Sequence, residues 1–122
     1  MRKKNFKGRC EKRTVGKCEE VCKTFDPIQY AYADVLQANR EVESFRCNVP
    51  LEADCVVPQN DVSVVEYMTD FVCTKTTGEI FVRECVERKF LTKPLTVKLL
   101  DASRQYWLRN GVIDWGIVVN EE

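Results

Sequence analysis

The sequence predicts a single α/β (α+β) domain in which a small central mixed β-sheet is flanked by helices. The first observation is size, because 122 residues with 44% hydrophobic content supply one core and leave little room for a second. The second is order: a helix-like segment precedes three strand-like segments, and a second helix and a short apolar run follow them. Chains with this order fold as one sheet with helices packed on it.

The first predicted helix begins at Asp26 and ends near Asn39. Asp26 suits the N-cap and Pro27 suits the first helical position. Residues 42–50 alternate between apolar and polar side chains, which predicts a strand, and residues 51–61 predict a strand end followed by a turn. In the first predicted helix, apolar residues recur at helical spacing: Ile28, Tyr32, Val35 and Leu36.

A hairpin is predicted in the middle of the chain. Residues 62–75 form its first strand, with a bend near Thr69, and residues 80–87 form the returning strand. The turn over residues 76–79 contains Gly78 where a positive φ is needed.

The last third of the chain predicts a loop, a helix and a strand. A loop over residues 88–93 leads to a helix that opens at Pro94, and Gly111 lies where a C-terminal cap belongs. The wholly apolar run at residues 115–119 predicts a buried strand.

Charge divides the chain into two parts: a basic arm at residues 1–25, in which residues 14–24 can form a short helix, and a domain at residues 26–122. Residues 1–23 contain nine Lys/Arg and three Asp/Glu, a balance of +6, and the remainder contains ten against sixteen, a balance of −6. A basic arm on an acidic body indicates contact with a polyanion such as DNA, and a solvated terminus is the alternative.

The cysteines indicate a reduced, cytoplasmic protein. Seven are present with no histidine, and the sequence contains neither a membrane-length apolar run nor a signal peptide. Reduced thiols packed as small hydrophobes are therefore favoured over disulfides. Cys10, Cys18 and Cys22 lie close together in the arm, but a zinc site there would need a fourth thiolate, for which Cys47 is a candidate.

Two carboxylates are predicted to meet across the hairpin. Asp70 and Glu84 lie fourteen residues apart with the turn midway between them. Two oxygen ligands at close range bind Mg²⁺ or Mn²⁺, and such an ion can activate water and stabilise a phosphoryl transition state. Solvation at the surface explains most such acid pairs, so this feature alone favours a metal site only weakly.

Five segments follow one another in the predicted order: VESFRCNVPLE (42–52), YMTDF (67–71), GEIFVRECV (78–86), SRQYWLRNGV (103–112) and DWGIVVN (114–120). Together they resemble the PD-(D/E)XK nuclease superfamily, and more narrowly the N-terminal catalytic domain of TnsA-type transposon endonucleases. The resemblance covers most of residues 26–120 and implies a restriction-endonuclease-like core.

The resemblance implies that Asp70 is a metal ligand and that the glutamate of a Glu-x-Lys triplet is the second. Residues 84–86 (Glu-Cys-Val) align with the triplet but place valine where lysine belongs, whereas residues 87–89 (Glu-Arg-Lys) restore the pattern. Because strand side chains alternate, only one of Glu84 and Glu87 can face Asp70 without a bulge. Glu84 is favoured as the ligand, and Lys89 has a stem long enough to swing back.

A third acid often lies on the first helix of the family, in a Ser-x-x-Glu pattern. Gln29 takes its place here, with Asp34 one turn on as the second choice. The predicted catalytic set is therefore Asp70, Glu84, Lys89, Glu87 and Gln29, with Asp70 and Glu84 as the ligands of Mg²⁺ or Mn²⁺.

The sequence thus predicts a Mg²⁺-dependent DNA endonuclease of a mobile element, which cuts strands at transposon ends. The resemblance implies a transposase and a regulator as partners. No Gly-rich phosphate loop is present, which argues against a nucleotide cofactor, and the absence of histidine excludes Ser-His-Asp chemistry and removes the usual base for a cysteine nucleophile. The alternatives are a catalytically degenerate DNA-binding or assembly subunit with the same fold, and a small protein-interaction factor.

Overall fold

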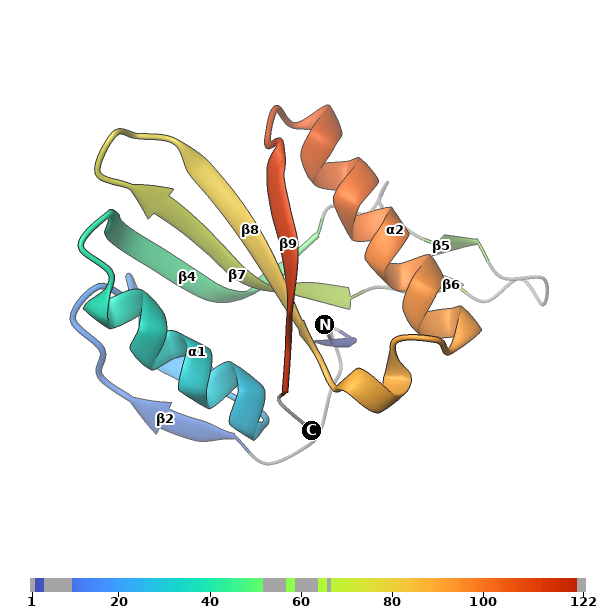
Figure 1. Cartoon of the computed structure of the whole chain (residues 1–122), viewed down its shortest axis with the longest axis horizontal. Helices are drawn as coiled ribbons and strands as arrows, with labels where there is room; N and C mark the ends of the chain where they lie inside the picture. Colours follow the sequence, from blue (N-terminus) through green and yellow to red (C-terminus); the bar gives the residue numbers. More distant parts are fainter. Residues whose placement is uncertain (1, 4–9, 52–56, 59–63, 66, 121–122) are drawn as a thin grey trace.

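The computed structural model describes residues 2–3, 10–51, 57–58, 64–65 and 67–120, and its centre is a five-stranded mixed sheet (Figure 1). Four strands lie side by side in the order β4 (Val42–Pro50), β7 (Tyr67–Lys75), β8 (Ile80–Val86) and β9 (Asp114–Val119). The first three are antiparallel, and β9 is parallel to β8. The fifth strand, β1 (Arg2–Lys3), pairs with the start of β7. The predicted mixed α+β architecture is confirmed.

Helix α1 (Pro27–Ala38) has the expected start. The Asp26 side chain accepts a hydrogen bond of 2.8 Å from the backbone N–H of Gln29, and Pro27 occupies the first helical turn. An N-cap of this kind satisfies a donor that the helix itself leaves unpaired. The cap fixes where the helix begins, and so it also fixes which residues face the sheet: Ile28, Gln29, Ala33 and Leu36.

Helix α2 (Pro94–Arg109) connects β8 to β9, and the short 3₁₀ helix η1 (Arg88–Phe90) lies in the predicted loop before it. Gly111 ends α2 and adopts a positive φ of 85°. Its N–H donates to the carbonyl of Leu108, and the N–H of Val112 donates to the carbonyl of Trp107 at 2.8 Å. A residue without Cβ adopts this left-handed conformation at little cost. Neither helix of the described chain is long and apolar enough to cross a membrane.

Apolar clusters on the two faces of the sheet hold the helices in place. Phe71 of β7 and Phe81 of β8 face α1, in a cluster that also contains Leu36. The next residue on each strand, Val72 and Val82, faces the opposite way and belongs to a second cluster, against which Trp107 of α2 packs. Because side chains alternate along a strand, this pattern places the two helices on opposite faces of the sheet.

Residues 14–24 do not form the predicted short helix. They contain a turn and then β3 (Cys22–Thr24), which pairs antiparallel with β2 (Glu11–Arg13). Val15 and Cys22 are buried in the α1-side cluster, and Arg13 forms an ion pair of 2.9 Å with Asp34. The helical spacing of the apolar residues was a weak signal in so short a segment, and pairing with neighbouring strands decides the conformation.

The predicted strand over residues 62–75 is divided in two. Strand β6 (Val64–Val65) pairs with β5 (Val57–Pro58) in a separate small sheet, and β7 begins at Tyr67. Most of the predicted turn over residues 51–61 lies outside the described residues.

Strands β8 and β9 are joined by a side-chain contact as well as by their ladder. Arg83 is half-buried, and its guanidinium lies 2.9 Å from the carboxylate of Asp114. Gly116 is the register partner of Arg83, and a Cβ at this glycine would lie 3.3 Å from the Arg83 side chain. The absence of a side chain at position 116 therefore makes room for the arginine.

Helix α1 offers a matched test of the core. Leu36 is 1% exposed and its neighbour Val35 is 54% exposed. We expect Leu36→Ala to lower the free energy of unfolding by about 2–5 kcal/mol, because it leaves a cavity between α1 and the sheet. Val35→Ala should change it by less than about 0.5 kcal/mol. Urea unfolding of both variants measures this, and equal losses would mean that α1 does not pack as described.

Candidate functional site

A fork between β7 and β8 creates the candidate site. The two strands pair from Thr74↔Ile80 as far as Phe71↔Arg83, and Asp70 and Glu84 are the next residues on each strand. Beyond this point, Met68 of β7 pairs with Pro50 of β4 on one edge and with Arg2 of β1 on the other. A strand has only two edges, so β1 takes the edge of β7 that β8 has left.

The two carboxylates bridge the start of the fork. The backbone N–H of Asp70 donates to Glu84 Oε1 at 3.0 Å, and the backbone N–H of Cys85 donates to Asp70 Oδ2 at 2.7 Å. Both side chains are fully buried. Each carboxylate thus accepts a hydrogen bond from the opposite strand, where the regular ladder has ended.

Both helices reach the same carboxylates. Ser103 of α2 donates to Glu84 Oε2 at 2.6 Å and accepts a hydrogen bond of 3.0 Å from the indole N–H of Trp115. Gln29 of α1 donates from Nε2 to Asp70 Oδ1 at 2.9 Å. The pair is therefore the point where the two strands and the two helices are joined by polar contacts.

Gln29 is held by further hydrogen bonds in an orientation that presents its amide N–H groups. Its Nε2 also donates to Asn48 Oδ1 at 2.8 Å, and its Oε1 accepts from the N–H of Phe25 at 2.8 Å. Asn48 adopts a positive φ of 56° and donates from Nδ2 to the carbonyl of Lys23 at 2.7 Å. A ligand of Mg²⁺ or Mn²⁺ presents an oxygen, whereas Gln29 in this orientation turns its N–H groups toward Asp70 and supports that carboxylate.

Burial and the neighbouring Asp70 carboxylate raise the pKa of Glu84 to about 8. Removing a carboxylate from water disfavours its charged form, and a second negative charge nearby does the same. At neutral pH and without a cation, the pair therefore retains one proton. A divalent cation would relieve both effects.

The other predicted site residues lie apart from the pair. Glu87 is half-buried at the start of η1, beyond the end of β8, and lines a hollow with Asp26 and Thr96. Lys89 is exposed, with its ammonium 5.2 Å from the centre of the Phe90 ring. Val86 occupies the predicted lysine position and is only 7% exposed. Asp34, the second choice for the third acid, is an exposed residue paired with Arg13.

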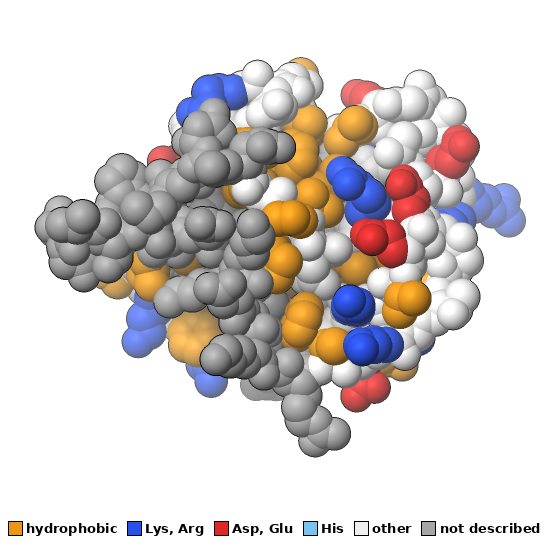
Figure 2. Space-filling model, turned by 180° about the vertical axis from the view of Figure 1, so that it is seen from behind, with side chains coloured by type: hydrophobic (Ala, Val, Ile, Leu, Met, Phe, Trp, Pro, Cys, Tyr) orange, Lys and Arg blue, Asp and Glu red, His pale blue; other side chains and the backbone are white. Residues whose placement is uncertain are grey.

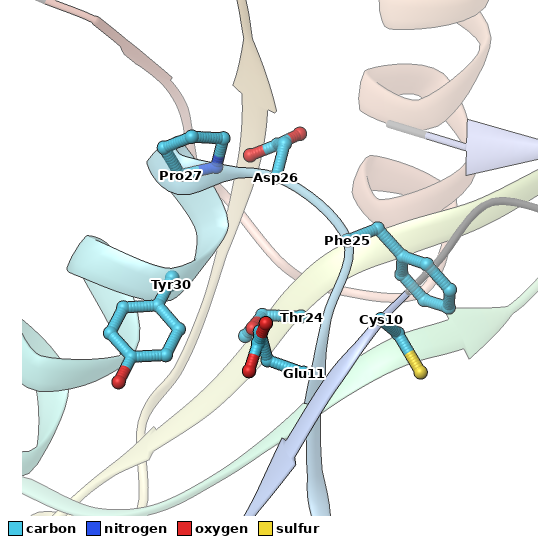
Figure 3. Close-up of a pocket in the computed structure, with 7 residues that line it drawn as sticks. All are labelled: Cys10, Glu11, Thr24, Phe25, Asp26, Pro27 and Tyr30. Carbon is cyan, nitrogen blue, oxygen red and sulfur yellow. The ribbon is translucent and has the colours of Figure 1, made fainter.

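A second cluster of ligand atoms lies at the N-terminal segment. The sulfur atoms of Cys18, Cys22 and Cys47 are all within 4.8 Å of one another, and this group could bind a metal ion. Cys10, which the sequence grouped with Cys18 and Cys22, lines a different hollow between β2, β3 and the start of α1, shown in Figure 3. Among the described residues, Cys18, Cys22 and the candidate Cys47 thus lie together, and Cys10 is not part of the group.

Two supporting residues were missed in the sequence. Ser103 lies in a helix one turn before Trp107 and close to the buried Leu100, so a hydroxyl at this position signals a buried partner. Asn48 gives no such signal, because its role depends on a backbone conformation that alternation does not reveal.

Two comparisons with known protein sequences found no match. No protein-family model matches the chain, and no curated protein matches it. The candidate site is therefore defined by its own geometry.

The raised pKa of Glu84 predicts an unusual pH dependence. The pKa of a glutamate is ordinarily 4.5, and that of Glu84 in the folded state is about 8. Between pH 4.5 and pH 8, the folded state therefore holds a proton that the unfolded chain releases. Stability contributed by this proton is complete below pH 4.5 and is lost as the pH rises to 8, by at most about 1.4 kcal/mol per pH unit. We expect Glu84→Gln to remove this slope and to be more stable than the wild type above pH 8.

Urea unfolding at a series of pH values from 5 to 9 measures the slope. Glu43→Gln, an exposed carboxylate on β4, serves as the control and should keep the wild-type profile. A Glu84→Gln profile parallel to that of the wild type would contradict the assignment of the proton to this pair.

Proposed function

We propose that this chain is a metal-dependent DNA endonuclease of a mobile element, of the TnsA type, which cuts DNA strands at transposon ends. The observation that carries the proposal is the meeting of Asp70 and Glu84 at the fork between β7 and β8. The setting supports it: an antiparallel run β4–β7–β8 continues into a parallel β9, with one helix before the run and one between β8 and β9. This order matches the segments on which the resemblance depends.

The donor set fits a hard divalent cation. Asp70 and Glu84 offer carboxylate oxygens, which Mg²⁺ and Mn²⁺ prefer, and the buried pair carries negative charge that a cation would compensate. Ser103 and the N–H of Cys85 hold the two carboxylates in position, and Gln29 orients Asp70. An ion held there would lower the pKa of a bound water and stabilise charge on a phosphodiester.

The proposed substrate is DNA because of the charge of the N-terminal segment. Nine of the chain's Lys/Arg residues lie in residues 1–23, and contacts with phosphates would make binding sensitive to salt. In Figure 2, the described part of the visible face mixes basic and acidic side chains beside an apolar strip. The N-terminal segment is therefore the proposed DNA contact, and a transposase and a regulator are the proposed partners in the cytoplasm.

A second candidate is a non-cutting member of the same fold, which serves as a DNA-binding or assembly subunit. Two observations favour it: Val86 is buried where the family's triplet has lysine, and Gln29 donates to Asp70 where the family has an acid. Valine at position 86 removes from the triplet the cation that would offset charge developing at the phosphate.

Manganese binding tests the proposed metal site. We expect calorimetry to show one Mn²⁺ bound by the wild type at micromolar to low millimolar affinity, and affinity that increases up to about pH 8 as the proton leaves Glu84. Asp70→Asn should abolish binding, whereas Asp101→Asn, an exposed acid on α2, should not affect it. Equal binding by Asp70→Asn, with its fold verified by circular dichroism, would place the metal elsewhere.

Plasmid nicking separates the two candidate functions. An active enzyme should convert supercoiled plasmid to nicked circles with Mn²⁺, and Glu84→Gln should eliminate the nicking. A non-cutting subunit should bind the same plasmid in gel-shift assays that Asp70→Asn leaves unchanged. If the wild type binds the plasmid without cutting it, we expect Val86→Lys to raise the nicking rate at least about tenfold over background. An increase of this size is within the range that one acid–base or electrostatic group supplies. Failure of the wild type to bind either Mn²⁺ or DNA would exclude both candidates.

A further inference from the structure

We propose that Cys18, Cys22 and Cys47 form a zinc site that fastens the N-terminal segment to the central sheet. The three residues come from three different parts of the fold. Cys18 lies in the turn after β2, Cys22 begins β3 and Cys47 lies on β4. The proposal is independent of the nuclease function, because the carboxylate pair takes no part in it.

The spacing of the sulfur atoms suits a metal ion better than a disulfide. Cys18 Sγ and Cys47 Sγ are 4.0 Å apart, and all three sulfurs lie within 4.8 Å of one another. Around a tetrahedral Zn²⁺ with Zn–S bonds of about 2.3 Å, sulfur atoms are about 3.8 Å apart. A disulfide needs an S–S distance of about 2.05 Å, so any of the three pairings would require a much larger movement of the sulfur atoms.

Backbone contacts hold the cysteines in this arrangement. The N–H of Phe45 donates to the carbonyl of Lys17 at 2.9 Å, and the N–H of Glu19 donates to the carbonyl of Phe45 at 3.0 Å. These two bonds fix Cys18, the residue between them, against β4. Cys47 lies two positions after Phe45, so the two residues share a face of that strand.

The donor atoms identify the class of metal. Three thiolates select soft or borderline ions such as Zn²⁺ over Mg²⁺ and Mn²⁺, whereas the Asp70–Glu84 pair offers only oxygen. Among the described residues the group contains only these three ligands, so a water molecule would fill the fourth position of a tetrahedral Zn²⁺. Cys18 is half-buried, and a hollow of about 470 Å³ that Glu20, Cys47 and Asn48 line gives water access to the cluster.

Bound zinc would join two separate sheets. Strands β2 and β3 form a two-stranded sheet separate from the central one, and Cys22 is the fully buried residue of β3 that faces the cluster. A shared ion would link this small sheet to β4 by strong bonds. We therefore expect zinc to stabilise the whole chain and not only the N-terminal segment.

Zinc titration of the reduced, metal-free protein tests the site. We expect one Zn²⁺ per chain by elemental analysis, a thermal midpoint raised by several degrees at saturation, and a thiolate-to-cobalt charge-transfer band when Co²⁺ is substituted. Cys18→Ser and Cys47→Ser should each weaken binding at least about tenfold and reduce the Co²⁺ band. Cys18→Ser is the main variant, because its half-buried position makes misfolding less of a concern than at the buried Cys22.

Two controls keep the result specific. Cys10→Ser removes a thiol from the separate hollow of Figure 3 and should bind zinc as the wild type does. Glu84→Gln removes one carboxyl group of the Asp70–Glu84 pair and should also leave zinc binding intact. The proposal is overturned if zinc fails to stabilise the wild type, if binding survives Cys47→Ser, or if Cys10→Ser loses as much affinity as Cys18→Ser.

Discussion

Asp70 and Glu84 carry two carboxylates into a region from which water is excluded, where burial and the charge of Asp70 raise the pKa of Glu84. The surrounding polar groups are arranged around this constraint. Two strands contribute backbone N–H groups, and the helices contribute Ser103 and Gln29. A buried acid pair without such donors would be strongly unfavourable, so the position of each element is constrained by its contribution to these hydrogen bonds.

Those parts of the fold that depend on local chemistry could be predicted from the sequence. The Asp26–Pro27 cap sets the start of α1, and Gly78 and Gly111 adopt the positive φ that their turns require. The conformation of residues 14–24 could not be predicted, because a few apolar residues at helical spacing are also compatible with a turn and a short strand. Pairing with β2 and contact with β4 decided its conformation, and neither is encoded locally.

The candidate sites likewise divide into one that local sequence predicts and one that depends on tertiary contacts. The hairpin turn lies midway between Asp70 and Glu84, and strand alternation selects Glu84 over Glu87. Asp70 and Glu84 could therefore be predicted as neighbours. The thiol cluster required knowledge of which strand lies beside the N-terminal segment: Cys47 is distant in sequence, whereas Cys10 is near in sequence but lies in another hollow. Proximity along the chain is a poor guide to ligand sets that are assembled by tertiary contacts.

The contact between Arg83 and Asp114 across Gly116 has a consequence for sequence variation. A Cβ at position 116 would already press on the Arg83 stem, and a larger side chain would displace the guanidinium from its carboxylate partner. The three positions should therefore covary: a homologue with a larger residue at 116 would lose the arginine at 83, and with it the reason to keep an acid at 114. Such joint substitutions would reveal distant relatives that retain the parallel β8–β9 pairing even after their carboxylate pair has diverged.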